Sequence, residues 1–527
     1  MIGTVEIFVG ILLAVAALAL LARRLHIPYP ILFVIGGLLL GLAPGVPRVQ
    51  LNPELVFVFF LPPLLYPAAL FTSWRDFRAD LRTISLLAVG LVLLTTAVIA
   101  WIAHHFMGMP LAAGFVLGAI VSPPDAIAAT AIAERLRVPR RIVTILEGES
   151  LVNDATALVA YRFAIMAVIT GSFSLSHAGV RFLVAATGGV AVGLVIGWLA
   201  DWFHRHVEDA PIEITVSLLT PFAAYLPADR LGLSGVLSVV TTGLYLGWRL
   251  PEITDYRTRL DARPVWDVVE FILNGLVFIL IGLQLPAILH AAEGDHLPRR
   301  QLILDALIIS LAVVVVRILW VFPTTYLPRF FLKSHRGEPC PSWKHITILA
   351  WTGMRGVVSL AAALALPLTK ADGSPFPGRD LIIFLSFIII LATLVVQGLS
   401  LPPLIRWLNI EDDDSLEREE REARLTANKA ALTRLSQVAE HDPAKAEALR
   451  RLRIEYEDRI RQLEAPDADR HDHKLHLFSV EYERLSREGL KQERNTILQL
   501  RNKNVINDEV LRRIQRDIDL AEARLLK

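Results

Sequence analysis

Four polar side chains gather in the segment GESLVNDATALV, residues 148–159, of a chain that is otherwise strongly apolar. They are Glu149, Ser150, Asn153 and Asp154. Residues four apart share one face of a helix, so Ser150 and Asp154 point in one direction and the other two occupy the adjoining strip. A hydroxyl and a carboxylate on one face are hard oxygen ligands, which suit a small hard cation. The segment therefore predicts a cation-binding site.

A further carboxylate follows a proline pair in SPPDAIAAT, residues 122–130. Proline lacks the backbone N–H and displaces the carbonyl four residues earlier, so we expect the helix to unwind around Pro123 and Pro124. Backbone exposed at membrane depth is tolerated only where protein or a water-filled cavity surrounds it. Asp125, directly after the break, is predicted to be a second cation ligand. The alternative is a simple proline kink whose carboxylate pairs with a neighbouring arginine.

Another interruption is expected in ILAWTGMRGVVSLAAALAL, residues 348–366. Gly353 and Gly356 flank Arg355 there, and glycine destabilises a helix. An arginine in the middle of an apolar segment must face the protein interior. We expect Arg355 to pair with Glu149 or to balance the aspartates, as a structural group more than as a contact to a substrate.

The elements that carry these groups are apolar enough to cross a lipid bilayer. The chain has 527 residues, of which 54% are hydrophobic and 20% charged, and its mean hydropathy is +0.49. A bilayer-spanning helix needs about 17–25 residues. About thirteen stretches approach that length, and we expect spans at 4–22, 28–44, 53–71, 83–104, 110–133, 141–169, 180–203, 212–227, 231–248, 265–289, 302–323, 343–367 and 380–407. The predicted fold class is an all-α polytopic membrane protein.

The distribution of Arg and Lys predicts the orientation. With the N-terminus outside, the loops expected inside carry most of the basic residues, for example Arg23, Arg135 and Arg140, as cytoplasmic loops do. The proline break then lies in the fifth span and the glycine–arginine break in the twelfth, and these spans run in opposite directions. Such a pair is typical of inverted repeats around a midplane site. We therefore expect two discontinuous helices to cross there.

The composition changes sharply after Leu408, and residues 409–527 are charged and nearly free of glycine. They predict a soluble, cytoplasmic, helical tail that is regulatory or dimerising. The preceding domain is expected to consist of a core and of a scaffold that includes dimer contacts. The predicted ranges are 1–408 for the transmembrane domain, around 83–170 and 302–407 for the core helices, and around 4–72 and 180–289 for the scaffold helices.

Several function classes find little support in the sequence. A net charge of +1 without a basic stripe gives no reason to expect nucleic acid as a partner. The single cysteine, Cys340, excludes an internal disulfide. The apolar spans contain no His/Asp metal cluster and no nucleophile elbow, so we expect a transporter and not an enzyme. A cation channel is the alternative from another class, although no repeated filter loop is present.

The chain resembles a known family of transporters in several motifs that occur in the same order and with similar spacing. They are LPPLLYPAAL (61–70), SPPDAIAAT (122–130), GESLVNDATALV (148–159), LIGLQLP (280–286) and GMRGVVSLAAALALP. Together they resemble the electroneutral sodium/proton exchangers of the cation/proton antiporter superfamily, in particular bacterial members with a cytoplasmic tail. The resemblance covers roughly residues 10–405.

The resemblance implies a role for each polar residue. Asp154 matches the carboxylate at which protons and cations compete. Asp125 and Ser150 match its companion ligands for Na+. Pro124 stands where many exchangers have a threonine, so a hydroxyl is lost, although a backbone carbonyl of Pro124 can still serve as a ligand.

Three supporting residues follow from the same resemblance. Asn153 occupies the position at which electrogenic relatives have a second aspartate. Glu149 and Arg355 match an ion pair that holds the region of the sixth span against the second interrupted helix.

The physical pattern and the resemblance imply the same activity. We expect an electroneutral antiporter that exchanges one Na+, or Li+, for one proton by alternating access, for pH and sodium homeostasis, with a K+/H+ antiporter as the alternative. No cofactor is expected. The expected partners are membrane lipid and a second copy of the chain, and the expected location is the bacterial inner membrane.

Overall fold

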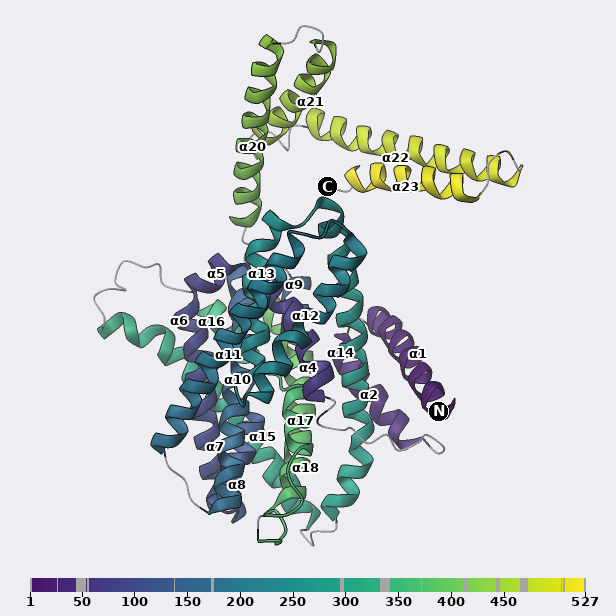
Figure 1. Cartoon of the computed structure of the whole chain (residues 1–527). Helices are drawn as coiled ribbons and strands as arrows, with labels where there is room; N and C mark the ends of the chain where they lie inside the picture. Colours follow the sequence, from purple (N-terminus) through teal and green to yellow (C-terminus); the bar gives the residue numbers. More distant parts are fainter. Residues whose placement is uncertain are drawn as a thin grey trace. The chain divides into compact units, whose positions relative to one another are not determined.

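The computed structural model describes residues 2–25, 27–43, 54, 56–136, 138–171, 175–293, 298–331, 342–370, 372–410, 415–441, 446–464, 473–503, 505 and 508–525. These residues form helices and connecting loops, with one isolated bridge between Thr369 and Pro375 as the extended pairing among them. Cys340 lies outside the described residues. The all-helical fold that the sequence predicted is therefore confirmed for the described chain (Figure 1).

The first half of the chain contains uninterrupted helices, helices with a π-helical turn, and one interrupted helix. The elements are α1 (Ile2–Leu25), α2 (Tyr29–Leu42), η1 (Val56–Phe60), α4 (Leu61–Phe71), α5 (Trp74–Ala79), α6 (Leu81–Ser85), η2 (Leu86–Leu91), α7 (Val92–Met107), α8 (Leu111–Val121), α9 (Ile127–Arg135), α10 (Arg140–Thr170) and α11 (Leu175–His204).

The second half repeats this mixture and ends in four charged helices. The elements are α12 (Ala210–Arg230), α13 (Gly235–Ile253), α14 (Tyr256–Glu293), α15 (Arg299–Phe331), α16 (Trp343–Trp351), α17 (Val357–Leu364), α18 (Arg379–Ala392), η4 (Thr393–Gln397), α19 (Gly398–Leu408), α20 (Ser415–His441), α21 (Ala446–Glu464), α22 (His473–Asn502) and α23 (Asp508–Leu525).

Every span expected from the sequence coincides with a helix or with an interrupted helix among the described residues. Seven helices in this part of the chain are long and apolar enough to cross a membrane by themselves, and α2, α4 with η1, and α8 are shorter apolar helices. The short expected spans at 212–227 and 231–248 fall within α12 and α13. The sequence pattern therefore predicted the positions of these helices correctly.

Small residues let the helices approach closely. A Cβ atom at Gly37 of α2 would lie 2.2 Å from the carbonyl oxygen of Ile279 in α14, and one at Gly282 of α14 would lie 2.2 Å from that of Val34. Small residues at such contacts are the usual device for packing helices in a membrane, where burying apolar surface between helices yields little. The same device brings Gly118 of α8 against α7.

Helix α10 lies between two packed regions. It contacts α8 and η2 on one side and α13 on another. Leu151 and Ala155 belong to a buried apolar cluster with residues of α4, α12 and α13, such as Tyr66, Tyr225 and Val239. A larger cluster contains residues of α7, α8, α16, α17 and α18. This placement puts the polar segment of α10 inside the protein.

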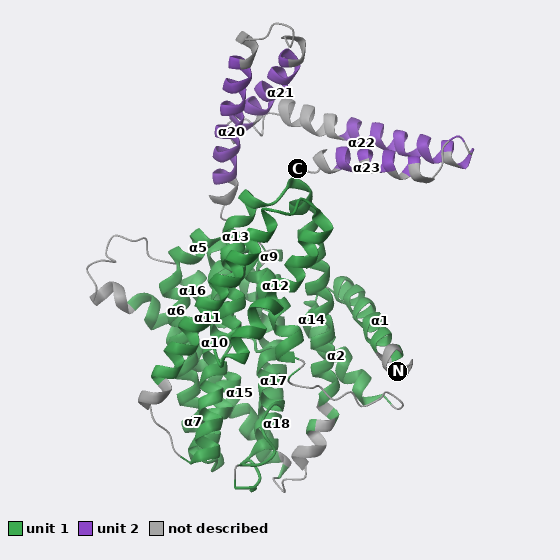
Figure 2. Ribbon diagram, viewed as in Figure 1, with its two compact units in different colours: residues 1–413 green, residues 414–527 purple. Residues whose placement is uncertain are grey.

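The chain divides into two compact units, residues 1–413 and residues 414–527 (Figure 2). The first holds all the apolar helices. In the second, α20 packs against α21 and α22 packs against α23. Ile497, Leu511 and Ile518 form a small buried core between α22 and α23.

Candidate ion-binding site

The polar segment of α10 lies in the middle of that helix and is buried. Asn153 is fully buried, and the exposed fractions of Glu149 and Asp154 are 1% and 7%. Ser150 is partly exposed. Groups that could be charged are costly in such surroundings unless protein groups or an ion compensate for the lost water. The neighbours of each side chain therefore decide its role.

The proline pair ends a helix, as the sequence predicted. Helix α8 stops at Val121 and α9 starts at Ile127, with unwound backbone between them. The Ser122 hydroxyl donates a hydrogen bond to the carbonyl of Ala119 (3.1 Å), one of the carbonyls that the prolines leave without a helical N–H partner. A carboxylate oxygen of Asp125 accepts a hydrogen bond from the Ile127 N–H (2.9 Å) and so caps the start of α9.

The glycine–arginine segment is unwound as well and meets the first break. Helix α16 ends at Trp351 and α17 begins at Val357. The backbone N–H of Asp125 donates to the carbonyl of Met354 (2.7 Å). A Cβ atom added at Gly356 would lie 1.8 Å from a carboxylate oxygen of Asp125. Glycine is therefore needed at this position because the Asp125 carboxylate lies directly on the backbone of the second break.

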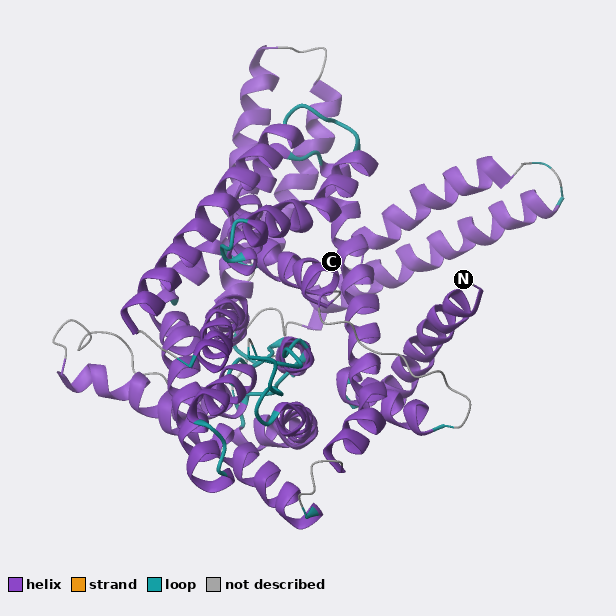
Figure 3. Ribbon diagram, turned by 60° about the horizontal axis from the view of Figure 1, so that its bottom comes forward, coloured by secondary structure: helices purple, strands orange, loops and turns teal. Residues whose placement is uncertain are grey.

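Unwound segments lie among the helices of the bundle in Figure 3. The contacts at Asp125 confirm that the two discontinuous helices meet where the sequence placed them. The starts of α9 and α17 carry partial positive charge from unpaired N–H groups, and the ends of α8 and α16 carry partial negative charge. Four helix ends thus meet within the protein.

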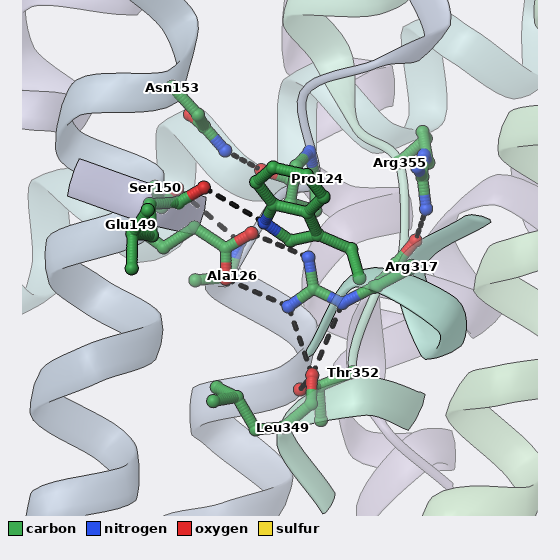
Figure 4. A network of polar contacts seen from close by, with 12 residues as sticks. Pro124, Ala126, Glu149, Ser150, Asn153, Arg317, Leu349, Thr352 and Arg355 are labelled. Atoms are coloured by element: carbon green, nitrogen blue, oxygen red, sulfur yellow. Dashed lines mark hydrogen bonds and ion pairs between the residues drawn. The ribbon is translucent and has the colours of Figure 1, made fainter. Parts of the chain in front are cut away.

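Helix α10 is tied to the first break by two side chains. The amide nitrogen of Asn153 donates to the Pro124 carbonyl (2.7 Å), and the Ser150 hydroxyl oxygen accepts a longer hydrogen bond from the Ala126 N–H (3.4 Å). Figure 4 shows both residues pointing from α10 toward the unwound segment. The structure therefore brings together Ser150, Asn153 and the backbone around Asp125.

The ion pair expected between Glu149 and Arg355 is wrong, because Glu149 pairs with a different arginine. Both guanidinium nitrogens at the tip of Arg317, in α15, donate to its carboxylate oxygens, at 2.5 Å and 2.8 Å (Figure 4). Arg317 is 1% exposed and also donates to the Leu349 carbonyl in the last turn of α16. The planar guanidinium matches a carboxylate in this two-bond geometry.

Arg355 donates hydrogen bonds to backbone carbonyls and not to a carboxylate. Its Nε donates to the carbonyl of Val121, the last residue of α8 (3.0 Å), and a terminal nitrogen donates to the carbonyl of Gly353. Its own N–H donates to the Thr393 hydroxyl (3.1 Å) in η4. A cation is favourable at a helix C-terminus. Arg355 therefore stabilises the end of α8 and the unwound backbone of the second break itself.

The carboxylate of Asp154 stands apart from these contacts. Among the described residues it has no hydrogen-bond or ion-pair partner, and Asp125 is the ionisable group whose charge acts on it. Two carboxylates near each other repel unless a proton or a cation lies between them. This pair of aspartates is therefore suited to hold a positive charge.

Two residues of this site, Arg317 and Thr393, were not among the site residues predicted from the sequence. Arg317 is a single arginine deep in the apolar span 302–323, and a charge at that depth must find a partner inside the protein. That signal was present, but it did not identify the partner. Thr393 gave no signal, since threonine is common in apolar helices as a group that bonds its own backbone.

Residues 10–407 match the sequence model of the sodium/hydrogen exchanger family, transmembrane part. The chain belongs to the sodium/hydrogen exchanger family. A protein of Mycobacterium tuberculosis named as a Na+/H+ exchanger is 39% identical over 529 residues, which cover 99% of this chain and 96% of that protein. The Na+/H+ antiporter ApNhaP of Aphanothece halophytica is 31% identical, with 96% and 94% covered.

Two further similarities concern the substrate range of a relative and the fold. The sodium, potassium, lithium and rubidium/H+ antiporter of Bacillus pumilus is 37% identical to this exchanger over 76% of the chain and 61% of its own length. The solved structure of the sodium proton antiporter MjNhaP1 from Methanocaldococcus jannaschii has a TM-score of 0.60 at 22% identity. It covers 77% of this chain and is itself covered completely, so the fold is that of this antiporter. This exchanger is thus a multi-pass membrane transporter and not an enzyme.

Proposed function

We propose that this exchanger couples the movement of one monovalent cation, Na+ or Li+, to the opposite movement of one proton, and that both compete for Asp154. The observation that carries the proposal is the buried Asp154 carboxylate, which lacks a protein partner among the described residues and experiences the charge of Asp125. A site that can be neutralised by a proton or by a cation, but not by both, produces exchange when it faces the two sides of the membrane in turn.

The oxygen atoms proposed to bind the cation come from both α10 and the first break. They are the carboxylates of Asp154 and Asp125, the Ser150 hydroxyl and the Pro124 carbonyl. The Pro124 carbonyl accepts one hydrogen bond, from Asn153, and a carbonyl oxygen has a second lone pair for a cation. The Ser150 oxygen likewise accepts one long hydrogen bond and keeps acceptor capacity. Hard oxygen ligands of this kind suit Na+ and Li+.

A one-to-one, electroneutral stoichiometry follows from Asn153. The neutral amide donates to the Pro124 carbonyl, a contact that a carboxylate could not make. Asp154 is then the one carboxylate on this face of α10 that titrates against the cation, since Glu149 is occupied by Arg317. Clamping the membrane potential of proteoliposomes with a potassium ionophore should leave the exchange rate unchanged. A rate that follows the imposed potential would contradict this stoichiometry.

Potassium exchange is the second candidate function. It is favoured by the Bacillus pumilus relative, whose name includes potassium and rubidium, and by Pro124, which offers no hydroxyl to a small ion. Proteoliposomes loaded with a pH-sensitive dye and given pulses of Na+, Li+ or K+ at several pH values distinguish the two. The proposal predicts proton movement with Na+ and Li+ that needs more cation as the pH falls, because protons compete for the same carboxylate. A response to K+ alone would favour the second candidate.

The cellular setting is proposed from sequence. We place the protein in the bacterial inner membrane as a homodimer, with the N-terminus outside and residues 409–527 in the cytoplasm, where the tail regulates or dimerises. The excess of basic residues in the loops expected inside supports this orientation. A fluorescent protein fused after Lys527 should be fluorescent and protected from protease added to intact cells. Cleavage of that fusion from outside would reverse the orientation.

A further inference from the structure

Helix α17, which follows the second break, ends in a way that leaves one buried carbonyl in need of a donor. Pro367 comes shortly after the helix and has no N–H, so it cannot donate to the carbonyl of Ala363, four residues earlier. The Leu366 N–H donates to that carbonyl instead (3.4 Å). In a continuing helix this N–H would have bonded to the carbonyl of Ala362. The Ala362 carbonyl therefore has no backbone partner among the described residues.

A tyrosine of α10 supplies the missing donor. The Tyr161 hydroxyl donates to the Ala362 carbonyl at 2.7 Å, and Tyr161 is only 7% exposed. Tyr161 comes seven residues after Asp154, which places both on one face of α10, about 10 Å apart along its axis. The helix that carries the proposed ion site is therefore bonded to the C-terminal end of α17.

The N-terminal end of α17 lies against the first break. Gly356 directly precedes the helix, and its backbone lies against the Asp125 carboxylate. The Met354 carbonyl accepts a hydrogen bond from the Asp125 N–H. Helix α17 has eight residues and so is about 12 Å long, which is short enough to shift as one unit. A shift of its C-terminal end relative to α10 therefore also shifts the backbone that holds Asp125.

A second side chain bonds the C-terminal end of α17, but it comes from a helix without a proposed ion ligand. Arg379 is the first residue of α18, and its Nε donates to the Leu366 carbonyl (3.1 Å). Both side chains satisfy carbonyls at this end of α17. Of the two, Tyr161 is the one that links it to the helix of Asp154.

We infer that Tyr161 is a positioning residue for the exchange, because its hydroxyl holds α17 against α10 and thereby sets the position of Asp125 relative to Asp154. The inference rests on the proposed exchange at Asp154. A cation takes oxygen ligands from both aspartates at once, so its binding depends on their relative position. A proton binds to a single carboxylate oxygen and depends less on that position. Loss of the hydroxyl therefore weakens cation binding more than proton binding.

Tyr161→Phe removes the hydroxyl and keeps the ring. Its Na+-driven proton flux is measured in proteoliposomes beside that of the wild type, over a range of Na+ concentrations at several pH values. The Na+ concentration for half-maximal rate should rise about three- to tenfold, as the loss of one hydrogen bond would give, while the maximal rate stays within about twofold. The pH at which this concentration has doubled from its alkaline value reports proton binding and should stay the same.

Arg379→Met is the matched control, because it removes the other donor at the end of α17 and leaves the bond to α10 intact. It should not change the Na+ concentration for half-maximal rate. Two results would overturn the inference. One is a lower maximal rate in Tyr161→Phe with an unchanged half-maximal Na+ concentration, which would show a role in folding alone. The other is an equal rise of that concentration in both variants, which would show a general loosening of α17.

Hydrogen exchange of the purified protein in detergent tests the same link without transport. In Tyr161→Phe the N–H groups of both breaks, residues 122–127 and 353–356, should exchange at least about threefold faster, because one hydrogen bond no longer holds them in place. Arg379→Met should leave their exchange unchanged. Unchanged exchange in Tyr161→Phe would show that Tyr161 does not position the breaks. This readout stands even if wild-type vesicles show no Na+-driven proton flux, the separate result by which the proposed exchange itself would fail.

Discussion

Two arginines are buried beside the proposed ion site, and each compensates for a different kind of negative charge. Arg317 forms two hydrogen bonds with the Glu149 carboxylate, whereas Arg355 donates to a carbonyl at the end of α8 and to one within the second break. Both are at most 2% exposed. With Glu149 neutralised in this way, Asp154 is left as the buried carboxylate of α10 that is available to a proton or a cation.

The buried pair should contribute strongly to stability. Glu149→Ala leaves the Arg317 guanidinium buried without its carboxylate, and breaking a buried pair from one side costs about 3–5 kcal/mol. Thermal unfolding of the purified protein in detergent should show a correspondingly lowered midpoint. Asp267→Ala breaks the exposed pair with Arg263, in which both side chains are 57% exposed, and should cost less than about 1 kcal/mol. Equal midpoints for the two variants would contradict a structural role for Glu149.

The two interrupted helices position the site because their unwound segments contact each other. The Asp125 N–H bonds to the Met354 carbonyl of the second break, and Arg355 bonds to the Val121 carbonyl at the edge of the first. Residues from α10 and η4 complete the contacts, through Asn153 and Thr393. These contacts satisfy part of the unwound backbone within the protein, as its place at membrane depth requires.

Gly356 is the position at which this arrangement tolerates the least change. A methyl group at Gly356 would collide with the Asp125 carboxylate, since its carbon would lie 1.8 Å from an oxygen of that group. Gly356→Ala should therefore displace Asp125 and reduce cation-driven proton flux at least tenfold, while the protein still inserts and purifies as a folded monodisperse species. Gly10→Ala is the control, since a Cβ atom there has no neighbour within 4 Å. Normal flux in Gly356→Ala would show that Asp125 does not need its observed position.

The sequence predicted where the two helices are interrupted, but it did not predict every side-chain contact at these breaks. Pro123, Pro124 and the two glycines beside Arg355 determine local backbone geometry, and local geometry can be derived from residue type alone. Whether Glu149 meets Arg317 or Arg355 depends on how α15 and α16 are rotated against α10. That rotation results from packing between segments far apart in the chain, and spacing along the sequence contains no information about it.

The whole chain combines an apolar unit that contains the proposed site with a charged helical unit, residues 414–527. The change in composition after Leu408 made this division visible in the sequence, because charged helices without long apolar stretches cannot remain in lipid. The division of the apolar unit into core and scaffold cannot be predicted from amino-acid composition. It depends on which contacts separate during transport, and it stays a prediction.

The tail should be dispensable for exchange itself. Every residue proposed to bind the ion lies in the first unit, and each unit is compact by itself. A chain that ends at Asp413 should therefore insert, fold and exchange Na+ for protons at a maximal rate within about twofold of the full chain. Its dependence on pH and its oligomeric state are expected to change if the tail regulates or dimerises. Complete loss of exchange by a folded truncated protein would place part of the site in the tail.

The most direct test of the account is the loss of one carboxylate oxygen at Asp154. Asp154→Asn keeps the size of the side chain, but the amide that replaces the carboxylate cannot release a proton when a cation binds. Purified variant and wild-type proteins are reconstituted side by side with a pH-sensitive dye and given Na+ or Li+ pulses, with Asp267→Asn as the matched control for charge. The account predicts that proton flux driven by either cation disappears in Asp154→Asn and stays normal in the control. Cation-driven flux that persists in Asp154→Asn would contradict it.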